Sequence, residues 1–356
     1  MRFLSLFAAA VLFAAVAVGT ASAQSSPSGP ALETPAATLA AALHCPGTLK
    51  DGNRPPVLLV PGTGLLGPEN WDWGYGPALR ALGIESCTVD LPGAGMGDIQ
   101  VAAEYVVYGV KQMAAETGGK VSVVGYSQGG LDIRWAIKHW PEIRPLIEDF
   151  VGIAPANHGA DSAAALCGLP AGCGPSIRQM SPGSKLLTAL DAGPQVFPGI
   201  SFTTVYSNTD GTVIPPGPRS SLTGASNISV QSICPASTVN HISMPADGVA
   251  WAVTIDALLR PGPADASRIG PGVCGTFVPG VTAETAAAKA QELTGLAFPR
   301  VLGYPPAAEP ALKAYAAAPL PPATGNTGPE SSGALAAWAF VACGLALLAA
   351  RRRALG

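Results

Sequence analysis

The strongest chemical signal in the sequence is a serine flanked by glycines. The segment Gly125-Tyr126-Ser127-Gln128-Gly129 follows the apolar run Val121 to Val124 and leads into Gln128 to His139, a segment expected to be helical. A strand that turns into a helix through G-x-S-x-G forms a nucleophile elbow, in which small glycines leave room for a strained serine backbone. The pentapeptide alone is weakly specific, and this strand-to-helix setting is what predicts Ser127 as a nucleophile.

A serine nucleophile needs a base at neutral pH, and that base is usually a histidine. The chain has four histidines. His44 precedes the first apolar strand, and His139 lies at the far end of the helix after the elbow. His158 precedes the best acid candidate and so breaks the Ser, Asp, His order of α/β-hydrolases. His241, which follows the strand candidate Ile228 to Ile233, is therefore the predicted base.

The histidine in turn needs an acid that fixes its tautomer, and this acid is expected at a strand end between the serine and the base. Phe202 to Tyr206 alternates as a strand does and leads into Ser207-Asn208-Thr209-Asp210. Asp210 is the predicted acid. Asp191 and Asp161 are less well placed alternatives.

Attack on an ester creates an oxyanion that needs prepositioned donors. The backbone N–H of Gln128, the residue after the nucleophile, is one expected donor. The second is expected from the loop Pro61-Gly62-Thr63-Gly64, which follows the apolar run Val57 to Val60. Thr63 offers both its N–H and its hydroxyl.

Strand and helix candidates alternate along the chain. Besides the strands above, Ser86 to Leu91 and Phe150 to Ala154 are expected to be strands, and the expected helices are 71–82, 99–113, 128–139 and 246–259. This alternation predicts a doubly wound, mostly parallel α/β sheet covered on both faces. Sites in such sheets form at the carboxyl ends of the strands, where the residues above are expected.

Composition favours a compact exported enzyme. Only 12% of the 356 residues are charged, while the chain has 43 glycines and 35 prolines. A net charge of −3 offers no basic footprint for nucleic acid. Residues 45–305 are long enough for one large domain with its own core, and no repeat of fixed period is present.

Both ends of the chain carry targeting features. Residues 1–23 combine Arg2, an apolar run and the small-residue site Ala21-Ser22-Ala23, which predicts a signal peptide. Residues 24–44 are expected to form a leader segment, and 306–333 a stalk rich in Pro and Ala. Residues 334–350 are apolar and precede a basic tail, 351–356, as in a transmembrane anchor.

Leu320-Pro321-Pro322-Ala323-Thr324-Gly325 lies just before this anchor and resembles a sortase sorting signal. The usual pattern is Leu-Pro-x-Thr-Gly, so one residue is inserted or a proline stands at the leucine position. Membrane anchoring and attachment to the cell wall by a sortase are both open. In either case the protein is expected to be exported and to act outside the cell or at its surface.

The cysteines are predicted to form disulfides. One of the seven, Cys343, lies in the apolar C-terminal segment, and the other six lie in the part expected to be exported. An even number of cysteines in an oxidising compartment indicates three disulfides, and six cysteines can pair in fifteen ways. A zinc site is less favoured, since the chain has neither a C-x-x-C pair nor an H-E-x-x-H helix. The six cysteines are Cys45, Cys87, Cys167, Cys173, Cys234 and Cys274.

These motifs resemble those of the Candida antarctica lipase B family over most of residues 45–275. The matching segments, in the same order, are Val60-Pro61-Gly62-Thr63-Gly64, Tyr126-Ser127-Gln128-Gly129-Gly130, Tyr206-Ser207-Asn208-Thr209-Asp210 and Asn240-His241. The resemblance implies an α/β-hydrolase fold, triacylglycerol lipase or esterase activity and no cofactor or metal. It implies Ser127, Asp210 and His241 as the triad and Thr63 and Gln128 as oxyanion donors.

The resemblance also implies disulfides Cys45 to Cys87 and Cys234 to Cys274, which leaves Cys167 and Cys173 as an additional pair. The sequence departs from the family at Ala156, where the family has an acidic residue, and over Gly159 to Leu190, the segment expected to cover the pocket as a mobile lid or a fixed wall.

The predicted function is hydrolysis of a carboxylic ester, on a lipid or a simpler ester substrate, through an acyl-enzyme on Ser127. An acyltransferase acting on envelope lipids is the alternative enzyme, and a non-catalytic surface-binding module is the alternative from another class.

Overall fold

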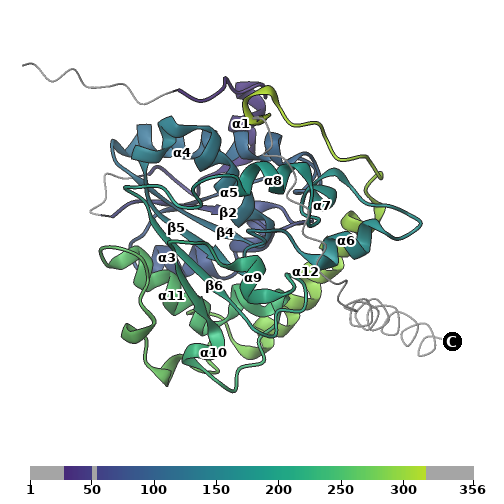
Figure 1. Cartoon of the computed structure of the whole chain (residues 1–356). Helices are drawn as coiled ribbons and strands as arrows, with labels where there is room; N and C mark the ends of the chain where they lie inside the picture. Colours follow the sequence, from purple (N-terminus) through teal and green to yellow (C-terminus); the bar gives the residue numbers. More distant parts are fainter. Residues whose placement is uncertain (1–27, 50–53, 318–356) are drawn as a thin grey trace, which may run out of the picture.

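A seven-stranded sheet forms the centre of the protein (Figure 1). The computed structural model describes residues 28–49 and 54–317. The strand order is β1-β3-β2-β4-β5-β6-β7; β2 to β7 run parallel, and β1 is an antiparallel edge strand. The strands are β1 (Leu43–His44), β2 (Val57–Val60), β3 (Ser86–Val89), β4 (Val121–Tyr126), β5 (Ile147–Ile153), β6 (Ser201–Tyr206) and β7 (Ser226–Ser229).

Helices cover both faces of this sheet. One hydrophobic cluster joins α1, α4, α5, α7 and α8 to the sheet, and a second joins α2, α3 and α11 to its other face. The helices are α1 (Ala36–Ala42), α2 (Gly67–Trp71), α3 (Tyr75–Ala81), α4 (Ile99–Thr117), α5 (Gln128–His139), α6 (Asp161–Cys167), α7 (Pro175–Gln179), α8 (Lys185–Asp191), α9 (Pro216–Ser220), α10 (Val230–Ile233), α11 (Gly248–Leu259) and α12 (Ala283–Gly303). Short 3-10 turns are Pro141–Leu146, His241–Ala246, Ala266–Arg268, Pro271–Val273 and Ala314–Ala316.

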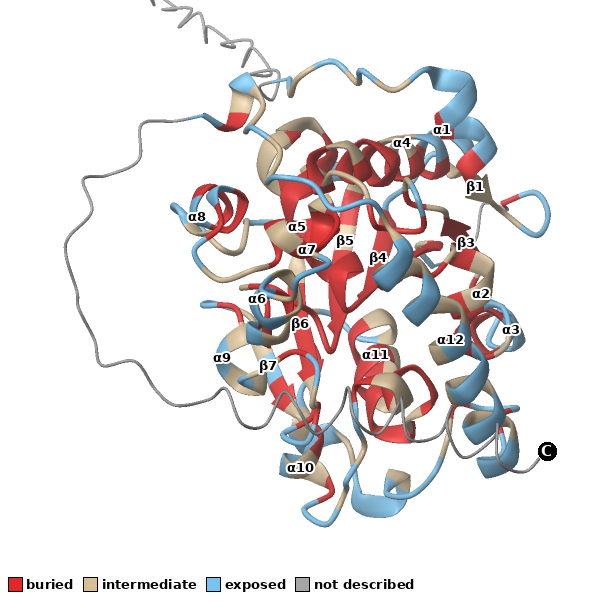
Figure 2. Ribbon diagram, turned by 90° about the vertical axis from the view of Figure 1, so that its right-hand side faces the viewer, coloured by how far each residue is buried: buried red, intermediate tan, exposed pale blue. Residues whose placement is uncertain are grey.

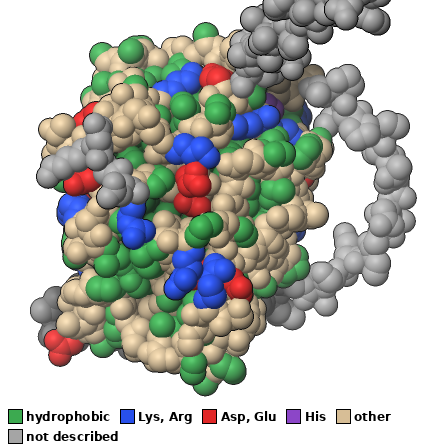
Figure 3. Space-filling model, turned by 90° about the vertical axis from the view of Figure 1, so that its left-hand side faces the viewer, with side chains coloured by type: hydrophobic (Ala, Val, Ile, Leu, Met, Phe, Trp, Pro, Cys, Tyr) green, Lys and Arg blue, Asp and Glu red, His purple; other side chains and the backbone are tan. Residues whose placement is uncertain are grey.

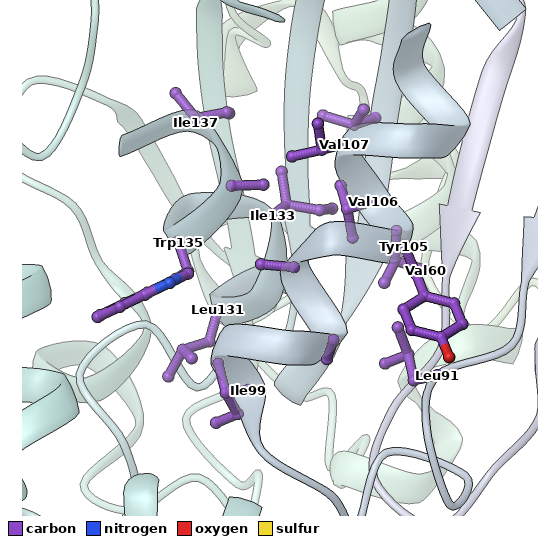
Figure 4. Close-up of a cluster of buried hydrophobic side chains, with 14 of the residues drawn as sticks. Val60, Leu91, Ile99, Tyr105, Val106, Val107, Leu131, Ile133, Trp135 and Ile137 are labelled. Carbon is purple, nitrogen blue, oxygen red and sulfur yellow. The ribbon is translucent and has the colours of Figure 1, made fainter. Parts of the chain in front are cut away.

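The central strands are largely apolar, as expected for strands whose two faces are both covered. Every residue of β2 and β4 is buried, and the sheet is among the most deeply buried parts of Figure 2. Figure 4 shows how the helical spacing of α4 and α5 fills one face: Val106 and Val107 of α4 lie near Ile133 of α5, and Ile99 lies near Leu131. The doubly wound, mostly parallel sheet predicted from the sequence is confirmed.

Two predicted elements differ from the structure, and one helix is additional. The helix expected over 71–82 is two helices, α2 and α3, which are separated by Asp72 to Gly74. The strand expected over 228–233 ends at Ser229, and the rest forms α10. A run as short as residues 228–233 shows no periodicity that distinguishes a strand from a helix, so the sequence could not show where the strand ends. The Ala-rich helix α12 was not predicted.

Residues 28–44 differ from the leader segment that their composition predicts. They carry α1, whose Leu39 is 2% exposed, and β1, which pairs with β3. Because Ala and Leu side chains bury without any polar partner, a short Ala-rich segment can close the edge of the sheet.

The C-terminal strap, residues 304–317, crosses the surface of the domain, although the sequence assigns its residues from 306 on to a stalk. Its Ala307 N–H donates to Cys173, and its Glu309 carboxylate accepts from the N–H of Leu186. Gln100, on α4, donates to the carbonyl of Ala311 at 3.0 Å. The strap thus connects α4 to the segment between β5 and β6.

Three disulfides link segments of the domain. They join Cys45 to Cys87, Cys167 to Cys173 and Cys234 to Cys274. The first attaches the N-terminal edge to β3, the second closes a short loop after α6, and the third connects the end of α10 to the 3-10 turn Pro271–Val273. Crosslinks of this kind favour the folded state mainly by restricting the unfolded chain.

The predicted signal peptide, sorting signal, apolar anchor and basic tail, and Cys343, lie outside the described residues. Within 28–49 and 54–317, no helix combines the length and apolar character needed to cross a bilayer. On the face drawn in Figure 3, acidic and basic side chains are interspersed among apolar ones, without a field of one sign.

Replacing Gln100 with leucine should loosen the strap. The Gln100 amide is fully buried, and its Oε1 accepts from the N–H of Lys313 at 2.7 Å. Leaving buried backbone groups unpaired costs about 1–3 kcal/mol. We expect Gln100→Leu to lower the urea midpoint at unchanged slope, whereas Gln291→Leu, at an exposed position of α12, should leave it unchanged. Equal midpoints for Gln100→Leu and the wild type would contradict this role.

Stability should fall with rising pH because of Asp149 on β5. Burial raises the pKa of this carboxyl to about 6, although a hydrogen bond from Ser122 lowers it in part. The folded protein therefore binds more protons than the unfolded chain between pH about 4 and 6, and its free energy of unfolding decreases over that window. Asp149→Asn should remove this decrease and be more stable by up to about 3 kcal/mol at pH 7, with no advantage at pH 4. Urea titrations of the wild type and Asp149→Asn at pH 4 and pH 7 measure the difference in free energy of unfolding between them. A difference that is the same at both pH values would contradict this role of Asp149.

Candidate active site

Ser127 lies at the sharp turn between β4 and α5. Its backbone has a φ of 54°, in the left-handed region that non-glycine residues rarely adopt. The flanking glycines permit this turn: a Cβ on Gly125 would lie 2.5 Å from the N of Gly130, and one on Gly129 would lie 2.5 Å from the carbonyl oxygen of Val60. The expected elbow is therefore present, at the carboxyl end of a central strand.

His241 reaches Ser127 from the start of a 3-10 turn, His241–Ala246. Its Nε2 lies 2.9 Å from the Ser127 Oγ. The imidazole stacks on the ring of Tyr126 with centroids 5.0 Å apart, and the Tyr126 hydroxyl donates to the His241 carbonyl at 3.0 Å. Burial raises the pKa of Tyr126 well above its usual range, so this hydroxyl keeps its proton.

Asp210 fixes the other side of the imidazole. It follows β6, and its Oδ2 lies 2.8 Å from the His241 Nδ1. Its Oδ1 accepts from the N–H groups of Thr212 and Val213, and its carbonyl accepts from the His241 N–H at 2.8 Å. With Nδ1–H donating to the carboxylate, Nε2 is left as the acceptor for the serine hydroxyl.

The structure brings Ser127, His241 and Asp210 together, and all three are less than 10% exposed. The alternative histidines lie elsewhere: His44 contacts Asp90, and His139 stacks on Trp135. Burial lowers the pKa of His139 to about 4.

His158 lies in a different pair, with Asp191. Its Nδ1 is 2.8 Å from the Asp191 carboxylate, and its Nε2 is 2.9 Å from the carbonyl of Ser221. The alternative acid Asp161 forms an ion pair with Arg219. Neither alternative acid is bonded to the histidine that faces Ser127.

The predicted oxyanion donors lie next to each other, since the side chains of Thr63 and Gln128 are hydrogen-bonded and Gln128 directly follows the serine. Gln128 is the first residue of α5, so its N–H precedes the first intrahelical hydrogen bond. The Thr63 N–H has no backbone or side-chain acceptor among residues 28–49 and 54–317. Both groups are thus available to an external acceptor.

The hydroxyl of Thr63 is already engaged, which the sequence did not reveal. Gln128 Nε2 donates to the carbonyl of Gly95 at 2.9 Å, and this fixes the amide so that its Oε1 accepts from the Thr63 hydroxyl at 2.7 Å. The single proton of that hydroxyl therefore points to Gln128, and donation to an oxyanion requires it to rotate.

Sequence reasoning missed the residues that support the site. The sequence indicated no role for Tyr126 and none for Asn70, whose Oδ1 accepts from the N–H of Gly62 at 3.0 Å. Asp132, one turn after Gln128, is fully buried, and burial raises the pKa of its carboxyl well above the usual range. The only signal available in the sequence was an acid placed between the apolar residues Leu131 and Ile133 of this helix.

The segment Gly159 to Leu190 forms α6, α7 and most of α8. Ala156, at the position where the family has an acid, is 2% exposed and belongs to the core. The N–H of Ile99 donates to the Gln179 side chain, which connects α7 to α4. The covering segment is thus packed against the domain.

Comparison with known proteins identifies the family. The chain is 33% identical to lipase B of Pseudozyma antarctica over 250 residues, which cover 68% of this chain and 73% of that protein. The crystal structure of Aspergillus fumigatus lipase B superposes with a TM-score of 0.74 at 29% identity, over 82% of this chain and 74% of that chain.

The chain is more distantly similar to the Bacillus licheniformis lipase BlEst2 in its propeptide form. That crystal structure superposes with a TM-score of 0.51 at 17% identity, over 63% of this chain and 54% of that chain. This similarity concerns the fold alone. No protein-family model matches the chain. The relationship to the fungal lipases therefore rests on sequence and structure together. The chain belongs to the lipase B family, and it is a carboxylic-ester hydrolase with the α/β-hydrolase fold.

Proposed function

We propose that this hydrolase cleaves carboxylic esters, on acylglycerols or simpler esters, through an acyl-enzyme on Ser127. The observation that carries the proposal is the continuous chain of hydrogen bonds from the Ser127 hydroxyl through His241 to Asp210. His241 accepts the proton as the serine oxygen attacks the acyl carbon, and returns it to the departing alcohol. Water activated by the same imidazole then releases the acid.

Charge on the carbonyl oxygen develops beside two backbone donors. The N–H groups of Thr63 and Gln128 have no acceptor among residues 28–49 and 54–317, and donors held in place before the reaction stabilise an oxyanion at little reorganisation cost. Asp210 holds His241 in the tautomer that can accept from the serine.

We further propose that the protein is exported. Three disulfides are typical of an oxidising compartment. Residues 1–23 are proposed to be removed as a signal peptide, and 334–350 to hold the enzyme at the cell surface, by a membrane anchor or after sortase processing. Both segments lie outside the described residues, and sequence alone supports these roles.

Replacing the nucleophile should abolish hydrolysis. We expect Ser127→Ala to lower kcat by about 10⁶-fold on p-nitrophenyl esters from acetate to palmitate and on emulsified triacylglycerol. Ser267→Ala, at an exposed site, is the matched control and should behave as the wild type. Activity on emulsion and long esters identifies a lipase, and activity on short esters alone identifies an esterase.

Two outcomes would overturn hydrolysis as the function. Faster product formation with an alcohol acceptor than with water would assign an acyltransferase. A wild-type protein that is inactive on every ester, and whose Ser127 does not react with a fluorophosphonate, would indicate a binding module.

Asp210→Asn should leave the fold intact and remove most of the activity. The asparagine oxygen can still accept from Thr212 and Val213, but its amide then points hydrogen atoms at the His241 Nδ1. That favours the tautomer with a proton on Nε2, which cannot accept from the serine. A loss of about 10⁴-fold in kcat is expected. A variant that retains more than a tenth of wild-type kcat would exclude this role for Asp210.

A further inference from the structure

Helix α12 packs directly against the loop that carries Thr63. A Cβ on Gly64, whose φ is 79°, would lie 2.9 Å from the Cα of Ala297, so the two backbones are almost in contact. α12 also packs on the 3-10 turn that begins at His241. Figure 2 shows α12 beside α2, with much of its outer surface exposed. The helix therefore touches both sides of the catalytic site.

An ion pair attaches α12 to this loop. Arg300 Nη1 donates to the carbonyl of Gly64 at 2.9 Å and to Glu69 Oε2 at 2.6 Å, and its Nη2 donates to Glu69 Oε1 at 2.9 Å. The guanidinium holds the pKa of Glu69 below its usual range. A bidentate pair of this kind fixes the orientation of the two side chains in addition to the attraction between their charges.

Glu69 extends the same attachment along the loop. Its Oε2 also accepts from the N–H of Leu66 at 2.8 Å, while the N–H of Gly64 donates to the Ala94 carbonyl at 2.8 Å. Together with the bond from Gly62 to Asn70, these contacts hold the backbone on both sides of Thr63. Because the Thr63 N–H has no acceptor within the part of the chain that the structure describes, the direction of this N–H depends on how the neighbouring residues are held.

We propose that Arg300 and Glu69 are positioning residues for the oxyanion donor Thr63. This inference rests on the proposed function, since it concerns the transition state of the same reaction. Neither residue touches the reacting atoms. By fixing the Gly64 carbonyl and the Leu66 N–H, the pair sets the direction of the Thr63 N–H, and α12 is the rigid support from which Arg300 acts.

A positioning role predicts a loss in kcat at nearly constant KM, because an oxyanion donor acts on the transition state rather than on bound substrate. We expect Arg300→Gln and Glu69→Gln each to lower kcat on p-nitrophenyl acetate about 10-fold, with KM within about 2-fold of wild type. The double variant should lose no more than either single one. Arg300→Lys, which keeps a donor for Gly64, should recover part of the loss.

The matched control is a second bidentate pair on the same chain. Arg268 donates from Nε to Asp256 at 2.9 Å and from Nη2 at 2.5 Å, and it belongs to the turn Ala266–Arg268, which follows α11. Arg268→Gln should lower the melting temperature without changing kcat. All assays are run well below the melting temperature of every variant, so that a lower kcat reflects a changed site rather than unfolded protein. If Arg300→Gln does not fold, Glu69→Gln provides the test.

Wild-type turnover that Ser127→Ala abolishes is the reference for all variants. Given that turnover, unchanged kcat in both Arg300→Gln and Glu69→Gln overturns the positioning role, as does a rise in KM alone. Absence of wild-type turnover instead overturns the proposed function. The rate of fluorophosphonate labelling of Ser127, measured in the same variants, is expected to fall with kcat.

Discussion

The backbone conformation of Ser127 is the constraint on which the rest of the site depends. A non-glycine residue with φ of 54° is strained by about 1–3 kcal/mol and persists only where its surroundings fix it. Here the Ser127 N–H donates to Ile153 of β5, and its carbonyl accepts from Ala156. Gly125 lets β4 approach α5, and Gly129 lets α5 approach β2, within distances that no side chain would permit. The sheet therefore stabilises the turn, and the turn directs the hydroxyl out of the sheet.

Parallel strands then bring the partners of that hydroxyl to it. β4 and β6 both pair with β5, so the loop after β6 that carries Asp210 opens at the same edge of the sheet as Ser127. The His241 N–H bonds to the Asp210 carbonyl, which means that backbone as well as side chain joins acid and base. Tyr126 completes the support by stacking on the imidazole. Residues far apart in the chain thus meet because the parallel strands all end at the same edge of the sheet.

Local patterns in the sequence predicted the elements that surround Ser127, and chain order with chemistry then selected Asp210 and His241. The patterns failed where structure depends on distant contacts. α12 is rich in Ala, and nothing local shows that Ala297 lies on Gly64 or that Arg300 pairs with Glu69 across 231 positions. The proton of the Thr63 hydroxyl was equally hidden, since its direction follows from the Gln128 amide and the Gly95 carbonyl.

The sequence also left open whether Gly159 to Leu190 is a mobile lid or a fixed wall, and the contacts of the strap favour a wall. Arg178 donates to the carbonyl of Ala307, Ala307 donates to Cys173, and Glu309 accepts from Leu186. The strap is itself held by the buried Gln100 on α4. Each such hydrogen bond contributes about 1 kcal/mol, and elements joined by several of them open together rather than singly. Movement of Gly159 to Leu190 would therefore have to carry the strap with it, and the hydrogen bonds between the two favour the fixed wall over the mobile lid.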